Sequence, residues 1–101
     1  MRVNKLYFQL LLRAPDQERR RLLRAVESYV IKEISETAYN LLHGAVSISR
    51  AKLKRLVRYK QILRSLSLRN VSLSRKRTLL QTRAGSSLLG FLLPFLIHHL
   101  S

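Results

Sequence analysis

The sequence predicts an all-α protein: a small bundle of four to five short helices, of which the C-terminal helix is strongly apolar. Apolar residues recur at helical spacing, and no alternation of period two is long enough to predict a strand. Prolines, glycines and serines that can begin or end helices separate the periodic stretches. With 101 residues, the chain is long enough for one domain at most.

The first half predicts two helical segments. A short helix is expected over Val3–Arg13, and Pro15 ends it and starts the next segment, because a proline at the first helical position loses no hydrogen bond. Residues 15–43 keep a helical period, and Gly44 follows as a left-handed C-terminal cap. This segment is long for one globular helix, so a break near Ser28–Lys32 is the alternative.

The second half predicts three further elements. A helix is expected over residues 50–66, preceded by Ser47 or Ser49 as N-cap, and the next helix begins at Ser72 or Ser74. Gly85 is expected to end that helix. Ser86 and Ser87 would then cap the last apolar segment, which Pro94 interrupts or kinks.

Charge is distributed unevenly along the chain. The formal net charge is +15, from 20 Lys and Arg against five Asp and Glu, and all five acids lie in the first half. Twelve Lys and Arg lie between Arg50 and Arg83, with no acid among them. The chain therefore divides into a helical domain of mixed charge (1–48), a basic helical DNA-binding segment (49–85) and an apolar tail (86–101).

Side chains that carry catalysis are scarce. The absence of Cys excludes disulfides, thiolate zinc sites and Cys nucleophiles. His43 is expected at a helix C-terminus, and the adjacent His98 and His99 diverge on a helix. Glu33 and Glu36 share a helical face without a third ligand. We therefore expect no enzyme activity, no metal site and no cofactor.

The basic segment predicts contact with a polyanion, with nucleic acid favoured over an anionic membrane or a solvated face. Helical cations can follow DNA phosphates, which occur about every 1.7 Å of duplex axis. Tyr59 is the one aromatic residue among them, so base stacking on single strands is disfavoured and non-specific binding to double-stranded DNA is preferred over RNA without excluding it. The candidate phosphate contacts are Lys52, Lys54, Arg55, Arg58, Arg64, Arg75, Lys76, Arg77 and Arg83. The run at 75–77 also fits a nuclear import signal.

The apolar tail, Leu88–Leu100, is shorter than the roughly 20 residues of a membrane helix. Three interpretations stay open for it. It packs on the preceding helices as core, inserts into a membrane interface, or binds a partner protein.

The stretch Arg75–Ile97 joins an Arg-rich segment to Gly85 and then to a Leu-Leu-Pro apolar sequence. It resembles the adenovirus core protein X family, the precursors of mu, and the similar basic core proteins of Polinton, Maverick and adintovirus elements. Asn40–Ser49 looks like the element-borne members. The resemblance implies condensation of packaged double-stranded DNA, cleavage by a viral protease after Gly85, and location in the virion or host nucleus. In the family's cleavage pattern, an apolar residue stands at the position of Thr82 and a glycine at that of Ala84.

The leading hypothesis is therefore a viral or element-encoded core protein that binds and condenses double-stranded DNA without sequence specificity. One alternative is a membrane-active protein, whose tail inserts while the basic segment docks to anionic lipid. The other is a helical adaptor, in which residues 15–43 bind a partner or form a homo-oligomer.

Overall fold

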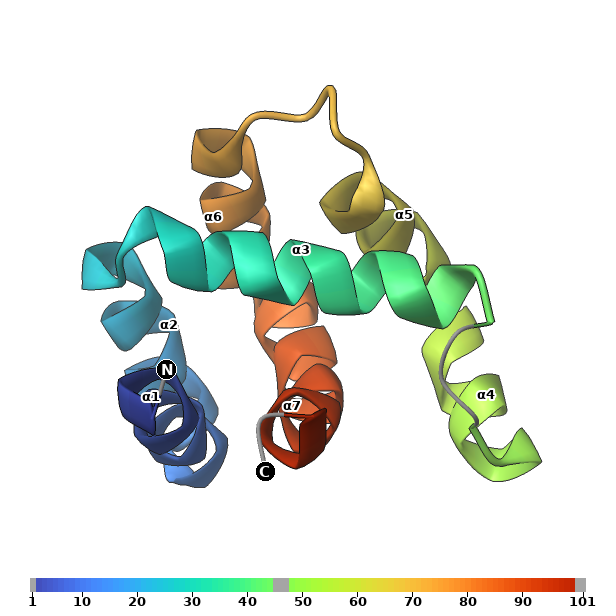
Figure 1. Ribbon diagram of the computed structural model, residues 1–101, viewed down its shortest axis with the longest axis horizontal. Helices are drawn as coiled ribbons and strands as arrows, with labels where there is room; N and C mark the ends of the chain where they lie inside the picture. The colour runs from blue at the N-terminus through green and yellow to red at the C-terminus, as the bar shows by residue number, and fades with distance from the viewer. Residues whose placement is uncertain (1, 45–47, 100–101) are drawn as a thin grey trace.

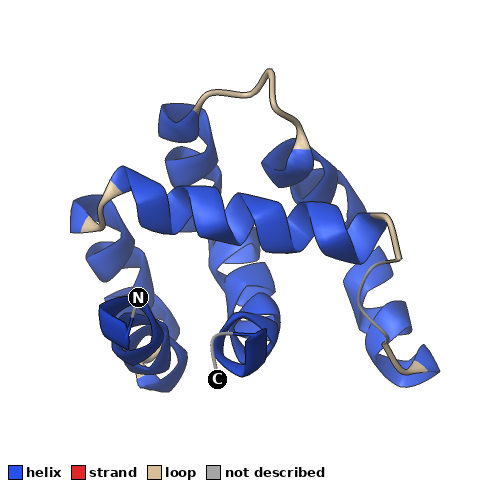
Figure 2. Cartoon of the chain, viewed as in Figure 1, coloured by secondary structure: helices blue, strands red, loops and turns tan. Residues whose placement is uncertain are grey.

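Seven α-helices and no strand make up the part of the chain that the computed structural model describes, residues 2–44 and 48–99 (Figure 2). The all-α prediction is confirmed. The helices are α1 (Arg2–Arg13), α2 (Asp16–Ala25), α3 (Ser28–Leu42), α4 (Arg50–Val57), α5 (Lys60–Ser67), α6 (Leu73–Gln81) and α7 (Arg83–His99). The radius of gyration, 12.4 Å, is close to the ~13 Å expected for a folded chain of this size.

The helix count exceeds the predicted four to five because both long predicted helices are broken. Residues 15–43 form α2 and α3, and the chain turns through extended backbone at Val26 and Glu27, just before the expected break. Val26 is buried there, so burial of an apolar side chain compensates for the lost helical hydrogen bonds. Residues 50–66 break at Arg58 and Tyr59 into α4 and α5. Neither break contains a glycine or proline to signal it.

The junction of α6 and α7 also differs from the prediction. Gly85 does not end a helix: α6 ends at Gln81, and the hydroxyl oxygen of Thr82 accepts a hydrogen bond from the Gly85 N–H at 3.0 Å. Thr82 therefore caps α7, the role predicted for Ser86 and Ser87. The last helix then continues through Pro94 to its end and is not interrupted there.

The apolar tail forms the centre of the core. Figure 1 shows α3 crossing in front of the C-terminal half, with α1 and α2 to one side and α4 to the other. Leu88, Leu89, Leu92, Leu93 and Leu96 of α7 are all buried, in one cluster with the apolar faces of α1, α2, α3, α5 and α6. The strongly apolar C-terminal helix is thus confirmed, and in this structure its leucines are core residues.

Two glycines are required for different reasons. Gly44 has φ +71°, the left-handed conformation predicted for the end of α3. Gly85 lies where α6 and α7 meet at a bend of 98°. A Cβ atom at residue 85 would lie 1.8 Å from the carbonyl oxygen of Leu79 and 2.9 Å from the Cα of Leu80. Side chains at residue 85 are therefore excluded by backbone atoms that cannot move without opening the corner.

The Gly85→Ala variant is expected to lower the free energy of unfolding by about 3 kcal/mol, because the corner of α6 and α7 must open. Gly44→Ala is the control: it meets open space and suffers only the left-handed strain of about 1 kcal/mol. Urea denaturation of both variants measures the difference. Equal losses would contradict the tight corner.

Candidate nucleic-acid interface

Two serine caps position the predicted cationic residues. The Ser49 hydroxyl accepts a hydrogen bond from the Lys52 backbone N–H at 3.3 Å, and the Ser72 hydroxyl accepts one from the Arg75 N–H at 3.1 Å. Each serine satisfies a free N–H in the first turn of its helix. The caps therefore fix where α4 and α6 begin, and both are among the residues predicted for this role.

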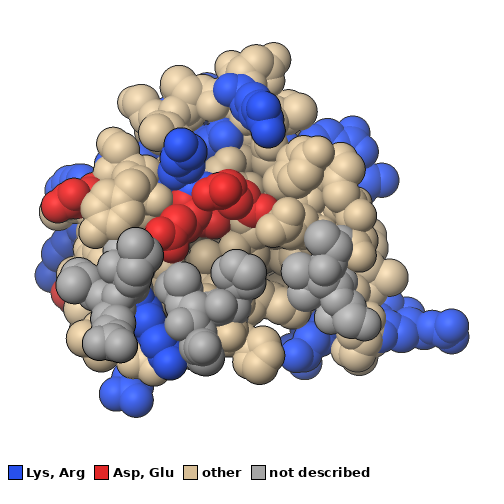
Figure 3. Space-filling model, in the orientation of Figure 1, with Lys and Arg blue, Asp and Glu red and all other residues tan. Residues whose placement is uncertain are grey.

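Helix α4 and its C-cap residue present cations on a surface that we call the α4 surface, formed by Lys52, Lys54 and Arg55 of α4 and by Arg58 at its C-cap. All four side chains are exposed, and Leu56 is the one buried residue of α4, whose residues are all described. Figure 1 shows α4 at the edge of the molecule, and Figure 3 shows Lys and Arg side chains projecting from the same corner. Exposed Arg64 extends the cationic series onto α5.

A hollow of about 400 Å³ lies between the α4 surface and α7. Arg55, Arg58 and Tyr59 line one side of it, and Ser87, Gly90 and Phe91 line the other. Nearby, the ammonium group of Lys52 lies 5.6 Å from the centre of the Phe95 ring, a cation–π distance. Cations of α4 thus border a cavity that is open to a ligand.

Lys76 and Arg77, predicted to contact phosphate, instead point into the protein. Lys76 is 4% exposed, and its Nζ donates a hydrogen bond to the Ser35 hydroxyl at 2.7 Å. The guanidinium of Arg77 donates to the carbonyl oxygens of Leu23, at 2.9 Å, and Val26, at the end of α2. Burial lowers the pKa of Lys76 because the charged ammonium loses hydration. These two side chains contribute to the fold.

The remaining predicted residues are dispersed. Arg75 is exposed near the start of α6, and Arg83 is exposed at the start of α7, beside α2. Gly85, the predicted cleavage position, is buried in the first turn of α7, which withdraws its peptide bond from solvent in the folded protein. The structure thus places Arg55 and Arg58 beside one hollow and Arg83 in a second pocket with residues of α2.

Sequence reasoning missed the arginines of α2. The guanidinium of Arg19 donates hydrogen bonds at 2.9 Å to the carbonyl oxygens of Leu11 in α1 and Ser86 in α7. A Cβ atom at residue 90 would lie 2.7 Å from Arg19 Nη1, so Gly90 provides the space that this guanidinium occupies. Burial lowers the pKa of Arg19, and the charge of Asp16 opposes that shift. The run Arg19-Arg20-Arg21 is the sequence signal for these residues, but it lies outside the basic segment 49–85.

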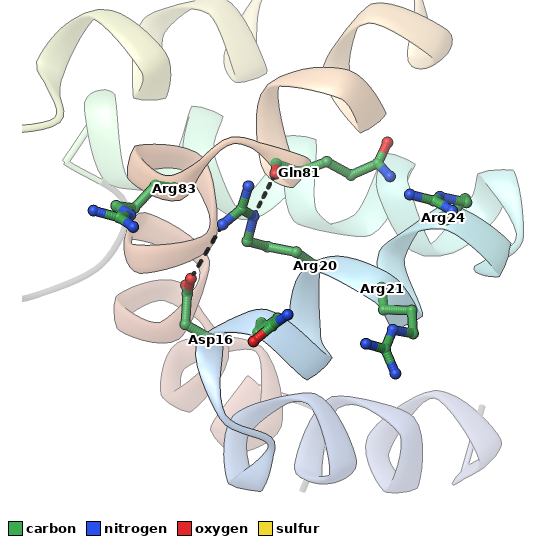
Figure 4. Close-up of a pocket in the computed structure, with 7 residues that line it drawn as sticks. Asp16, Arg20, Arg21, Arg24, Gln81 and Arg83 are labelled. Carbon is green, nitrogen blue, oxygen red and sulfur yellow. Dashed lines mark hydrogen bonds and ion pairs between the residues drawn. The ribbon is translucent and has the colours of Figure 1, made fainter.

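A second basic site, the arginine pocket, lies where α2 meets the junction of α6 and α7 (Figure 4). Its volume is about 750 Å³. It is lined by Asp16, Gln17, Arg20, Arg21, Arg24, Gln81 and Arg83. Four arginines thus face a single carboxylate.

Asp16 and Glu18 lie in α2 beside its arginines, and the other three acids lie on α3 or at the residue before it. Figure 3 shows Asp and Glu side chains gathered in the middle of the face that α3 crosses, with Lys and Arg around its edge. Glu33 and Glu36 belong to α3. No group of three or more His, Asp or Glu side chains that could hold a metal ion occurs in the described ranges. Segregation of the acids leaves the α4 surface uniformly cationic.

Comparisons of this chain with protein-family models, with curated proteins and with solved structures find no match. Among the described residues, no single helix has the length and hydropathy of a membrane span. The bent pair formed by α6 and residues 83–98 reaches both only when its two helices are taken together.

The Lys76→Met variant should lose a pH-dependent part of the free energy of unfolding. Because burial lowers the folded-state pKa of Lys76, the unfolded chain binds more protons between that value and about 10.5, so wild-type stability rises with pH in this window. Methionine removes the buried charge, so this rise should diminish, while stability at pH 7 changes by less than about 1 kcal/mol or increases.

Urea denaturation from pH 7 to pH 10 measures this effect. Lys32→Met removes an exposed lysine and serves as the control, which should keep the wild-type pH dependence. An unaltered slope in Lys76→Met would show that burial of this ammonium group does not affect folding.

Proposed function

We propose that this protein binds double-stranded DNA without sequence specificity through the α4 surface and Arg64, and condenses it as a viral or element-encoded core protein. The observation that carries the proposal is the exposure of all four cations of the α4 surface, three on a helix with one buried residue and the fourth at its C-cap. No Asp or Glu follows Glu36 in the sequence, so no carboxylate from this half of the chain competes with phosphate for those cations.

The dimensions of α4 suit the phosphate backbone. Its eight residues extend over about 12 Å, and duplex DNA presents about one phosphate per 1.7 Å of axis when both strands are counted. Four cations over this length can therefore engage several phosphates at once. The arginines add bidentate hydrogen bonds to phosphate oxygens, which lysines cannot make.

The side chains of the α4 surface favour the backbone over the bases. Direct reading of base edges uses Asn and Gln for adenine and Arg or Lys for guanine; α4 contains neither Asn nor Gln, so guanine is the one base that its cations can read. Lys and Arg contacts to phosphate position a protein on DNA but carry no sequence information. The resemblance of Arg75–Ile97 to the adenovirus core protein X family supports the same function, with the virion or host nucleus as its location.

Binding to an anionic membrane is the second candidate, and exposed apolar residues of α4 favour it. Leu53 and Val57 are 48% and 62% exposed, one helical turn apart and among the lysines and arginines. A helix of this kind can lie in a lipid interface. The apolar tail, which the membrane hypothesis expects to insert into the bilayer, is buried in the core. Membrane binding would therefore depend on α4 alone. Sedimentation with phosphatidylserine vesicles tests it, and loss of binding in Leu53→Ser/Val57→Ser would favour it.

DNA binding should weaken steeply with salt and should not depend on sequence. Gel shifts with unrelated duplexes should give equal affinities. If six to ten phosphates are contacted, affinity should fall about 10³–10⁵-fold between 50 and 200 mM salt, because bound counterions are released. Lys54→Gln/Arg58→Gln removes two contacts and should reduce the slope of log affinity against log salt by about 1.8.

Lys32→Gln/Arg69→Gln is the matched control, since it also removes one exposed lysine and one exposed arginine. Arg69 lines a hollow with Glu36, away from α4. This control should keep the wild-type slope. Equal slopes for all three proteins, or no binding at low salt, would refute the proposed interface.

A further inference from the structure

Two of the arginines in the arginine pocket are bound within the protein. Arg20 donates a hydrogen bond to the Gln81 carbonyl oxygen at 2.8 Å and lies 3.7 Å from the Asp16 carboxylate, the two contacts drawn in Figure 4. Arg21 lies 3.4 Å from Glu18. These contacts hold the wall of the pocket and neutralise part of its charge.

Arg24 and Arg83 are available to a ligand. Both side chains are exposed, and neither guanidinium makes a hydrogen bond or ion pair with any residue of the described ranges. Figure 4 shows them on opposite sides of Arg20, one from α2 and one from α7. Arg83 is the first residue of α7, a helix of 17 residues, so the positive end of its dipole adds to the potential of the pocket. The pocket therefore suits an anion with several charges, such as consecutive phosphates.

The α2 side of the arginine pocket lies far from the α4 surface, whereas Arg83 lies one helical turn before Ser87, which lines the hollow beside α4. Along the longest axis of the molecule, 32 Å between its outermost Cα atoms, Figure 1 shows α2 toward one end and α4 toward the other. The Debye length at physiological ionic strength is about 8 Å, which is short against this dimension. Salt therefore largely screens the repulsion between a duplex bound at one end and a second duplex bound at the other.

We propose that the arginine pocket is a second DNA-phosphate site, and that one molecule bridges two duplexes by binding one at α4 and the other at α2. This inference rests on the proposed function. It assigns the condensing step to residues of α2 and α7, outside the α4 surface. A compact protein with two cationic ends draws duplexes together without needing to oligomerise.

A capture assay tests this bridge with the full-length protein. One biotinylated duplex is fixed to beads, and a second, fluorescent duplex is retained only if protein joins the two. Wild-type capture should rise with protein concentration and then fall, because excess protein fills each duplex separately. Arg24→Gln/Arg83→Gln should reduce capture about tenfold or more, while its gel-shift affinity for one duplex stays within about threefold of wild type.

Three further variants separate the outcomes. Lys54→Gln/Arg58→Gln should weaken both gel shift and capture, and Lys32→Gln/Arg69→Gln should change neither. Arg24→Lys/Arg83→Lys keeps the charges and should keep capture, which distinguishes loss of phosphate contact from loss of folding. Wild-type capture by Arg24→Gln/Arg83→Gln, or a loss no greater than its loss of gel-shift affinity, would overturn the second site. Failure of the wild type to shift any duplex would instead overturn the proposed function.

Discussion

The fold depends on cationic side chains that donate hydrogen bonds to backbone carbonyl oxygens rather than to carboxylates. Arg19 binds carbonyls of α1 and α7, Arg20 binds the last carbonyl of α6, and Arg77 binds carbonyls at the end of α2. Lys76 reaches Ser35, whose hydroxyl donates in turn to a carbonyl of α5. With five acids against 20 basic residues, carboxylate partners are scarce, and of these four cations only Arg20 has one among the described residues. Most of the acceptors are carbonyls at the C-terminal ends of α1, α2 and α6, where the negative end of the dipole favours a cation; the Ser86 carbonyl, near the start of α7, is the exception.

This arrangement divides the basic residues into two groups with separate tasks. The inward group joins helices that are distant in sequence: Arg77 is 54 residues from its partner Leu23, and Arg19 is 67 residues from Ser86. The outward group, which includes the α4 surface, meets solvent. Because Arg19, Lys76 and Arg77 use carbonyl or hydroxyl oxygens, none of them requires an acid to move into the interior, and the acids stay on α2, on α3 and at the residue before α3. The surface thereby keeps its excess of positive charge for an anionic ligand.

How far the sequence predicts this structure depends on how local each feature is. Helical periodicity and the caps at Ser49, Ser72 and Gly44 act within one turn, so the sequence predicts them correctly. The break at Arg58 has no local signal, and Gly85 was misread because its role comes from a close approach to Leu79 across a corner.

The candidate site follows the same division. Exposure of α4 could be predicted from its cations and narrow apolar stripe. The inward turn of Lys76 could not, because its acceptor lies 41 residues away on another helix. The arginine pocket was missed for a similar reason: Arg24 and Arg83 are brought together only by the packing of α2 against the junction of α6 and α7.

The cationic segment and the apolar tail, so different in composition, are two parts of one structure. A net charge of +15 on a body only 32 Å long opposes folding by self-repulsion, and exposed helices such as α4 bury little apolar area of their own. The leucines of α7 supply that area, since a fully buried leucine contributes about 1.5–3 kcal/mol. After Arg83, α7 contains no Lys, Arg, Asp or Glu, and this uncharged stretch in the centre allows cations to cover the outside. Phosphates bound to the folded chain would reduce the repulsion further, so DNA binding, if it occurs as proposed, would stabilise the folded chain.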